Sequence, residues 1–131
     1  METKTYRKNQ VIFEKGAPGG CMYEVYIGRV GVFANYGTPE QKLLNEYYSG
    51  QYFGEMGILD EVPRSATAVS LEDDTCIAPI SEEGFEAFFR ENPARVWMVM
   101  EQMSHNLRRR TLEYAEVCSK VKELSEKEAQ A

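Results

Sequence analysis

The segment from Phe53 to Thr67 holds the residues best able to recognise a ligand. Gly54 and Gly57 allow a backbone to approach a ligand closely. A short helical turn starting at about Glu55 would point unpaired N–H groups at one spot, which suits an anion. Arg64 can add a charge-assisted contact to a phosphate, and Glu55 can accept a hydrogen bond from a sugar hydroxyl. These residue types predict a pocket for a phosphorylated sugar.

Taken singly, these residues have a plainer interpretation, in which the glycines mark a bulged loop and Glu55 and Arg64 form a surface ion pair. Their order argues against it. The sequence reads Phe-Gly-Glu-Met-Gly-Ile-Leu, then a short acidic spacer, then Pro-Arg-Ser-Ala-Thr. This pattern closely resembles the phosphate-binding cassette of the cyclic nucleotide-binding domain family, which occurs in catabolite activator proteins, kinase regulatory subunits and gated channels.

The resemblance covers roughly Val11 to Val117, and it implies a role for each cassette residue. By that similarity Glu55 would bind the ribose 2′-hydroxyl, Arg64 the exocyclic phosphate oxygens, and Ser65 a further phosphate oxygen. Ser65 stands where cyclic-GMP-selective members carry threonine, so cyclic AMP is the expected ligand and cyclic GMP the alternative. The implied ligand-binding residues are Phe53, Gly54, Glu55, Met56, Gly57, Arg64, Ser65 and Ala66, together with Arg110 and Thr111 on the C-terminal helix.

The sequence departs from the family pattern in three places. It begins almost directly with the first predicted strand, so the N-terminal helices common in the family are expected to be missing or reduced. It ends at Ala131, without space for the helix-turn-helix of a catabolite activator, so the effector is expected in another chain or in a portion absent from this one. Arg110 replaces the small hydroxyl residue usual near the base, which leaves the base selectivity open.

Strands separated by glycine and proline are predicted over the first two thirds of the chain, as in an all-β sandwich or barrel. We expect one mainly β domain over residues 1–131, with a double-stranded β-helix, or jelly roll, over residues 6–80 and the cassette at 53–67. C-terminal helices follow over residues 81–128. The predicted strands are Val11–Phe13, Met22–Ile27, Val30–Tyr36, Lys42–Tyr48, Ala66–Leu71 and Thr75–Ile80.

Two helices are predicted after the strands. Ser81 is an N-cap for a short core-facing helix, and Pro93 occupies the first position of a longer one. The longer helix carries inward heptad positions with alternating spacings of four and three, which predicts a homodimer through helix 93–128. A helix packed on its own sheet explains only the first half of this seam. The seam residues are Val96, Met100, Met103, Leu107, Arg110, Tyr114, Val117, Val121 and Leu124.

Composition excludes several other classes of function. The net charge of −6 argues against direct nucleic-acid binding. No apolar run reaches the roughly 20 residues needed to cross a bilayer, and the polar N-terminus is not a secretory signal, so we expect a cytoplasmic protein without membrane contact. The three cysteines are expected to be reduced thiols. With His105 as the only histidine, neither a metal site nor a catalytic triad is expected.

The leading functional hypothesis is therefore a non-enzymatic sensor that couples nucleotide binding to the position of the long helix, with no cofactor. The alternative is a dimerising interaction module whose pocket is vestigial or takes a different ligand. The complete set of Glu55, Arg64 and Ser65 favours the sensor. An enzyme is the least favoured class, because no residue supplies a catalytic base, a nucleophile or a metal ligand.

Overall fold

The structure is a computed structural model that describes residues 2–54 and 63–130. By its internal contacts the chain divides into two compact units, residues 1–93 and residues 94–131. Among the described residues, the strands and the short helix belong to the first unit, and the second is a single helix. The expectation of one domain over the whole chain stays a prediction.

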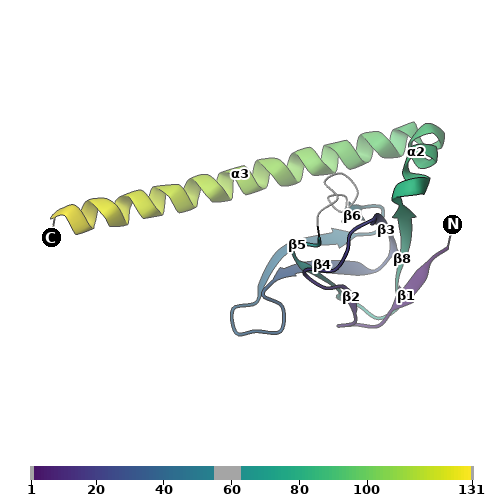
Figure 1. The fold of residues 1–131 in the computed structure, drawn as a ribbon, viewed down its shortest axis with the longest axis horizontal. Helices are drawn as coiled ribbons and strands as arrows, with labels where there is room; N and C mark the ends of the chain where they lie inside the picture. Colours follow the sequence, from purple (N-terminus) through teal and green to yellow (C-terminus); the bar gives the residue numbers. More distant parts are fainter. Residues whose placement is uncertain (1, 55–62, 131) are drawn as a thin grey trace. The chain divides into compact units, whose positions relative to one another are not determined.

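Two four-stranded antiparallel sheets make up most of the first unit (Figure 1). One sheet has the order β1 (Lys4–Tyr6), β8 (Thr75–Ser81), β3 (Cys21–Ile27) and β6 (Tyr52–Phe53). The other has the order β2 (Val11–Phe13), β7 (Thr67–Ser70), β4 (Arg29–Ala34) and β5 (Lys42–Tyr48). Most neighbours in these sheets are far apart in the sequence, as β1 and β8 are. This sandwich confirms the predicted fold class.

Both sheets contribute side chains to one core. Val25, Phe53 and Ile77 come from the first sheet, and each is 0% exposed. Val30, Tyr47 and Ala68 from the second sheet complete the cluster. Each large side chain buried in this way contributes about 1.5–3 kcal/mol, so the interior of the sandwich is the main source of its stability.

All six predicted strands agree with the observed ones to within two residues, but two of the described strands were not predicted. β1 and β6 have only three and two residues, too few to show an alternating pattern. The strand predicted to reach Tyr36 ends at Ala34, because Asn35 and Gly37 adopt positive φ angles of 53° and 81° that turn the chain.

The helix α2 (Glu82–Glu91) begins where the sequence predicts. The Gly84 N–H donates to Oγ of Ser81 at 3.0 Å, and Ser81 has the extended backbone of an N-cap. Phe88 is the buried residue of this helix, and its ring lies edge-on to Tyr52 of β6. Figure 1 shows α2 following directly from β8. The prediction of a short core-facing helix is confirmed.

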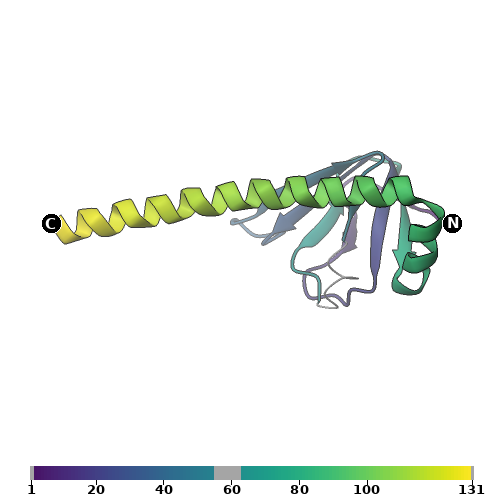
Figure 2. The same ribbon diagram turned by 90° about the horizontal axis from the view of Figure 1, so that it is seen from above.

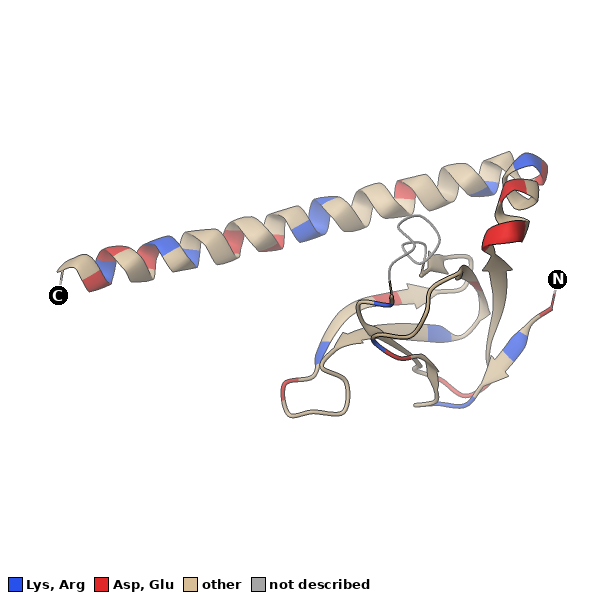
Figure 3. Ribbon diagram, in the orientation of Figure 1, with Lys and Arg blue, Asp and Glu red and all other residues tan. Residues whose placement is uncertain are grey.

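The second unit is formed by α3 (Pro93–Gln130), an uninterrupted helix of 38 residues (Figure 2). At 1.5 Å per residue it is about 57 Å long. Figure 3 shows acidic and basic residues distributed along it. Most of the predicted seam is exposed, including Met100, Leu107 and the residues from Tyr114 to Leu124. No helix in the described part of the chain is long and apolar enough to cross a membrane.

Candidate functional site: a buried arginine at the end of the cassette

The backbone of Arg64 is fixed by the loop that joins β2 to β3. The Arg64 N–H donates to the carbonyl of Ala17 at 2.9 Å, and the Gly16 N–H donates to the carbonyl of Arg64 at 2.7 Å. Gly16 has a φ of +88°, a conformation that glycine adopts without the strain that other residues incur. This paired contact holds Arg64 in place three residues before β7 begins.

The side chain of Arg64 is directed into the sandwich and is only 7% exposed. Its Nη1 donates to the carbonyl of Gly54 at 2.8 Å, and its Nη2 donates to the carbonyl of Cys21 at 2.6 Å. The central guanidinium carbon lies 4.3 Å from the ring centroid of Phe13 and 5.7 Å from that of Tyr23. Two carbonyls and two aromatic faces therefore orient the guanidinium plane.

The positive charge of Arg64 is not balanced within the described residues. No carboxylate in residues 2–54 and 63–130 forms an ion pair with it. Its Nε is buried and has no hydrogen-bond partner among the described residues. A buried cation without a counter-charge is costly, and a guanidinium is well shaped to bind the oxygens of a phosphate. The arrangement therefore suits an anionic ligand.

Gly54 is required at its position for two separate reasons. Its φ is +78°, and its carbonyl accepts the hydrogen bond from Nη1 of Arg64. A Cβ atom built on Gly54 would lie 2.9 Å from that same Nη1 and 3.5 Å from the ring of Tyr23. The absence of a side chain thus leaves the space that the guanidinium occupies.

Three aromatic rings form the support beneath Arg64. The ring centroids of Tyr23 and Phe53 are 5.0 Å apart, and Phe13 stacks on both at 5.9 and 6.1 Å. Burial, followed by a hydrogen bond with Cys21, holds the pKa of Tyr23 above its usual value of 10.0. Burial likewise raises the pKa of Tyr6, with Cys21 as a second cause. Both phenols thus stay protonated at neutral pH.

The structure brings together only some of the predicted site residues. Phe53, Gly54 and Arg64 meet in the first unit, where Ala66 is buried and Ser65 is exposed. Glu55, Met56 and Gly57 lie outside the described residues, so their predicted roles are untested.

The other two predicted contacts, Arg110 and Thr111, belong to α3 in the second unit, and both are exposed. The hydroxyl of Thr111 donates to the carbonyl of Leu107 at 2.8 Å, one helical turn earlier. Their predicted contact with the base therefore stays a prediction.

Sequence reasoning missed Phe13, Tyr23 and the carbonyl of Cys21. The two aromatic residues lie in strands that the sequence predicts, but no spacing relates them to Arg64, which is more than 40 residues away. Arg64 within the cassette was the only signal in the sequence, and it does not indicate which aromatic rings contact it. Among the described residues, no three His, Cys, Asp or Glu side chains are placed to hold a metal ion.

Comparisons with known proteins agree with this geometry. The cyclic nucleotide-binding domain family matches residues 3–92. The cyclic AMP receptor protein of Thermus thermophilus is 31% identical over 113 residues, which are 86% of this chain and 52% of the relative. The cAMP-dependent protein kinase regulatory subunit of Aspergillus fumigatus is 31% identical over 86 residues, 66% of this chain and 20% of that protein.

Solved structures give the same result. The crystal structure of the Thermus thermophilus catabolite activator protein superposes with a TM-score of 0.75 at 30% identity, covering 88% of this chain and 54% of that one. The chain thus spans about half the length of these bacterial relatives and about a fifth of the kinase subunit. With the sandwich, the buried arginine and a family match over most of its length, the chain belongs to the cyclic nucleotide-binding domain family.

Proposed function

We propose that this chain is a regulatory sensor that binds cyclic AMP and performs no catalysis of its own. The observation that carries the proposal is the buried guanidinium of Arg64, which is oriented by two carbonyls and has no counter-charge among the described residues. An exocyclic phosphate supplies that charge and accepts hydrogen bonds from the remaining N–H groups. The cassette residues Phe53 to Ala66 then surround the phosphate and ribose.

Support for cyclic AMP comes from two sources. Ser65 occupies the place where cyclic-GMP-selective family members carry threonine. The names of both sequence relatives described above refer to cyclic AMP. Cyclic GMP is the competing ligand, because a cGMP-dependent protein kinase of Eimeria tenella is also 25% identical over 95 residues.

The output of the proposed sensor is the position of α3, in a homodimer formed through the seam. Leu107 and Tyr114 are exposed and occupy the same inward position in two consecutive heptads. They support this part of the proposal, because a second helix stabilises apolar side chains at such positions. Replacing both by lysine should convert a dimer into a monomer in sedimentation experiments. A parent protein that is already monomeric at tens of micromolar would contradict the dimer but not the nucleotide site.

Calorimetric titration with cyclic AMP and with cyclic GMP tests the ligand. Arg64→Ala should weaken binding by about 2–4 kcal/mol, because a charge-assisted contact in a partly desolvated pocket is lost. Arg64→Lys keeps the charge without the planar fork and should give an intermediate loss. Arg90→Ala is the matched control, because Arg90 pairs with Glu86 on the exposed face of α2.

The titration also distinguishes the proposed sensor from a second candidate function, a dimerising interaction module with a vestigial pocket. The exposed seam is the observation that favours it. A folded protein that forms dimers but binds neither nucleotide would support this module. Equal affinities of the parent and a folded Arg64→Ala variant would show that the cassette assignment is wrong.

A further inference from the structure

The thiol of Cys21 lies beside the guanidinium of Arg64, and no part of the proposed nucleotide contact uses it. Nη2 of Arg64 donates to the carbonyl of Cys21 and also lies 3.8 Å from its Sγ, a hydrogen-bonding distance for sulfur. Cys21 and Tyr23 are two residues apart on β3, so their side chains project from the same face of that strand. The sulfur therefore shares the face on which Arg64 meets the ring of Tyr23.

A second donor reaches the same sulfur. Burial, and after it a hydrogen bond with Cys21, raise the pKa of Tyr23. Because the phenol stays protonated at neutral pH, its O–H can donate to the sulfur. Tyr6 of β1 lies nearby as well, since Cys21 is the second cause, after burial, that raises its pKa. A guanidinium and a phenol thus face Sγ of Cys21, and such donors stabilise negative charge on a sulfur or on an oxygen attached to it.

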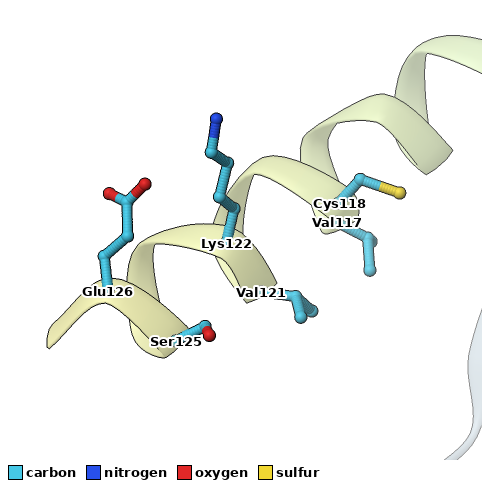
Figure 4. Close-up of a pocket in the computed structure, with 6 residues that line it drawn as sticks. All are labelled: Val117, Cys118, Val121, Lys122, Ser125 and Glu126. Atoms are coloured by element: carbon cyan, nitrogen blue, oxygen red, sulfur yellow. The ribbon is translucent and has the colours of Figure 1, made fainter. Parts of the chain in front are cut away.

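The other two cysteines have different surroundings. Cys76 is partly exposed, as Cys21 is, but its neighbour Ile77 points into the core, so Cys76 projects from the opposite face of β8. Cys118 is exposed on α3, where its sulfur and the amine of Lys122 point in different directions (Figure 4). Among the described residues, Cys21 alone has a sulfur within hydrogen-bonding distance of a cation, and its partial exposure admits a small reagent.

Arg64 is itself suited to an anion at this place. It is only 7% exposed, its Nε has no hydrogen-bond partner among the described residues, and no carboxylate in that part of the chain pairs with it. An anionic oxygen attached to the sulfur of Cys21 would lie next to Nη2 and would supply the missing charge. One oxygen atom added to Cys21 would therefore compete with a phosphate for the same guanidinium.

We propose that Cys21 is a site of oxidation by hydroperoxides, and that its sulfenate product takes the guanidinium of Arg64 away from the phosphate of the nucleotide. The effect on nucleotide affinity rests on the proposed function, whereas the modification of the thiol does not. The chain would then respond to two kinds of small molecule through one buried arginine.

The chemistry of this step is a two-electron oxidation. The sulfur attacks one oxygen of the hydroperoxide, so that an S–O bond forms as the O–O bond breaks. The sulfur loses two electrons, and the peroxide is reduced to an alcohol, or to water in the case of hydrogen peroxide, with the thiol proton passing to the departing oxygen. A dithiol reverses the change by reducing the sulfenic acid to the thiol, while the dithiol becomes a cyclic disulfide and water is released.

Labelling with dimedone, which reacts with sulfenic acids, tests the modification without any nucleotide. The full chain is treated with hydrogen peroxide, and mass spectrometry locates the adducts. Cys21 should be labelled at least about fivefold faster than Cys76 and Cys118, because donors surround its sulfur. Tyr23→Phe keeps the ring but removes one donor, so it should slow the labelling of Cys21, whereas the control Tyr114→Phe should not. Labelling of Cys21 no faster than that of Cys76 would overturn the proposal.

Calorimetric titration with cyclic AMP measures the consequence. A variant carrying Cys76→Ser and Cys118→Ser keeps only the thiol of Cys21, and it is titrated before peroxide, after peroxide and after subsequent dithiothreitol. Oxidation should lower its affinity by roughly tenfold or more, and dithiothreitol should restore it, because a charge-assisted contact of Arg64 is lost and regained. Cys21→Ser is the matched control, and its affinities before and after peroxide should be equal.

Two further outcomes separate this inference from the proposed function. An oxidised Cys21 with unchanged nucleotide affinity would show that the sulfenate does not compete for Arg64, and the inference would fail while the nucleotide site stands. If the untreated protein binds neither cyclic nucleotide, the proposed function fails, and Arg64→Gln then decides whether the two side chains act together. This variant should slow the labelling of Cys21 when circular dichroism shows it to be folded, and an unchanged rate would overturn the inference.

Discussion

The two units of the chain differ in where they place their apolar surface. The sandwich turns Val25, Phe53 and Ile77 inward, and all three are fully buried. The helix α3 leaves Tyr114 and Leu124 more than half exposed. Because burial of apolar area is the main driving force of folding, the first unit satisfies that requirement by itself, whereas the distal half of α3 leaves its apolar side chains exposed.

The arginines of the two units show the same contrast. Arg64 is fixed by its backbone, by two carbonyls and by two rings, so its geometry is set before a ligand arrives. Arg110 is exposed on a helix. A preorganised group loses little conformational freedom on binding, whereas an exposed one must be ordered by its partner. The first arrangement is typical of a small-molecule site and the second of an assembly surface.

The largest expected effect is a difference between the two units in how much a core substitution lowers the free energy of unfolding. Ile77→Ala should destabilise the sandwich by about 2–5 kcal/mol, because it leaves a cavity in a fully buried cluster. Leu124→Ala should change the same unfolding transition by less than about 0.5 kcal/mol. Urea unfolding followed by near-ultraviolet circular dichroism, at concentrations low enough to prevent dimerisation, measures both. Comparable losses for the two variants would contradict the contrast.

Gly54→Ala should damage the pocket more than the fold. The strained positive φ costs about 1–2 kcal/mol, and the new methyl group displaces the guanidinium of Arg64. Gly50→Ala is the matched control, since Gly50 has a φ of +86° and open space around its Cβ position. We expect similar stability losses from the two variants but loss of nucleotide binding only from Gly54→Ala. Calorimetric titration would contradict this if both variants bound alike.

Alkaline pH should affect the sandwich through Tyr23. Its pKa is raised in the folded state, so above about pH 10 the unfolded chain loses the phenolic proton while the folded chain retains it. This contribution to stability is complete below pH 10 and is lost as the pH rises further. Tyr23→Phe should therefore make the urea midpoint fall less steeply above pH 10. Tyr114→Phe on α3 serves as control, and identical slopes for both variants would refute the prediction.

The smallest expected effect concerns the base. If Thr111 hydrogen-bonds to it, Thr111→Ala should change the ratio of affinities for cyclic AMP and cyclic GMP by up to about tenfold, the equivalent of one hydrogen bond. Arg110→Ala removes the other predicted base contact and should shift the same ratio in the same titration. Should neither substitution alter the ratio, the base contacts lie elsewhere and α3 acts only in assembly.

Much of the fold was predictable because the local signals agreed. Glycines and positive-φ turns separate the strands, Ser81 caps α2, and Pro93 begins α3. The short strands β1 and β6 could not be predicted, since their residues become strands only by pairing with β8 and β3. Of the site, the sequence identified Gly54 and Arg64 but not the groups that hold them.

The sequence alone determined the order of the cassette residues and the heptad pattern of α3, because these depend only on residue type and spacing. Tertiary structure decided that Phe13 and Tyr23 form the surface beneath Arg64, and that the carbonyls of Gly54 and Cys21 orient it. Such contacts join segments that antiparallel pairing brings together from distant parts of the chain. No local pattern records which backbone oxygen a buried guanidinium will meet.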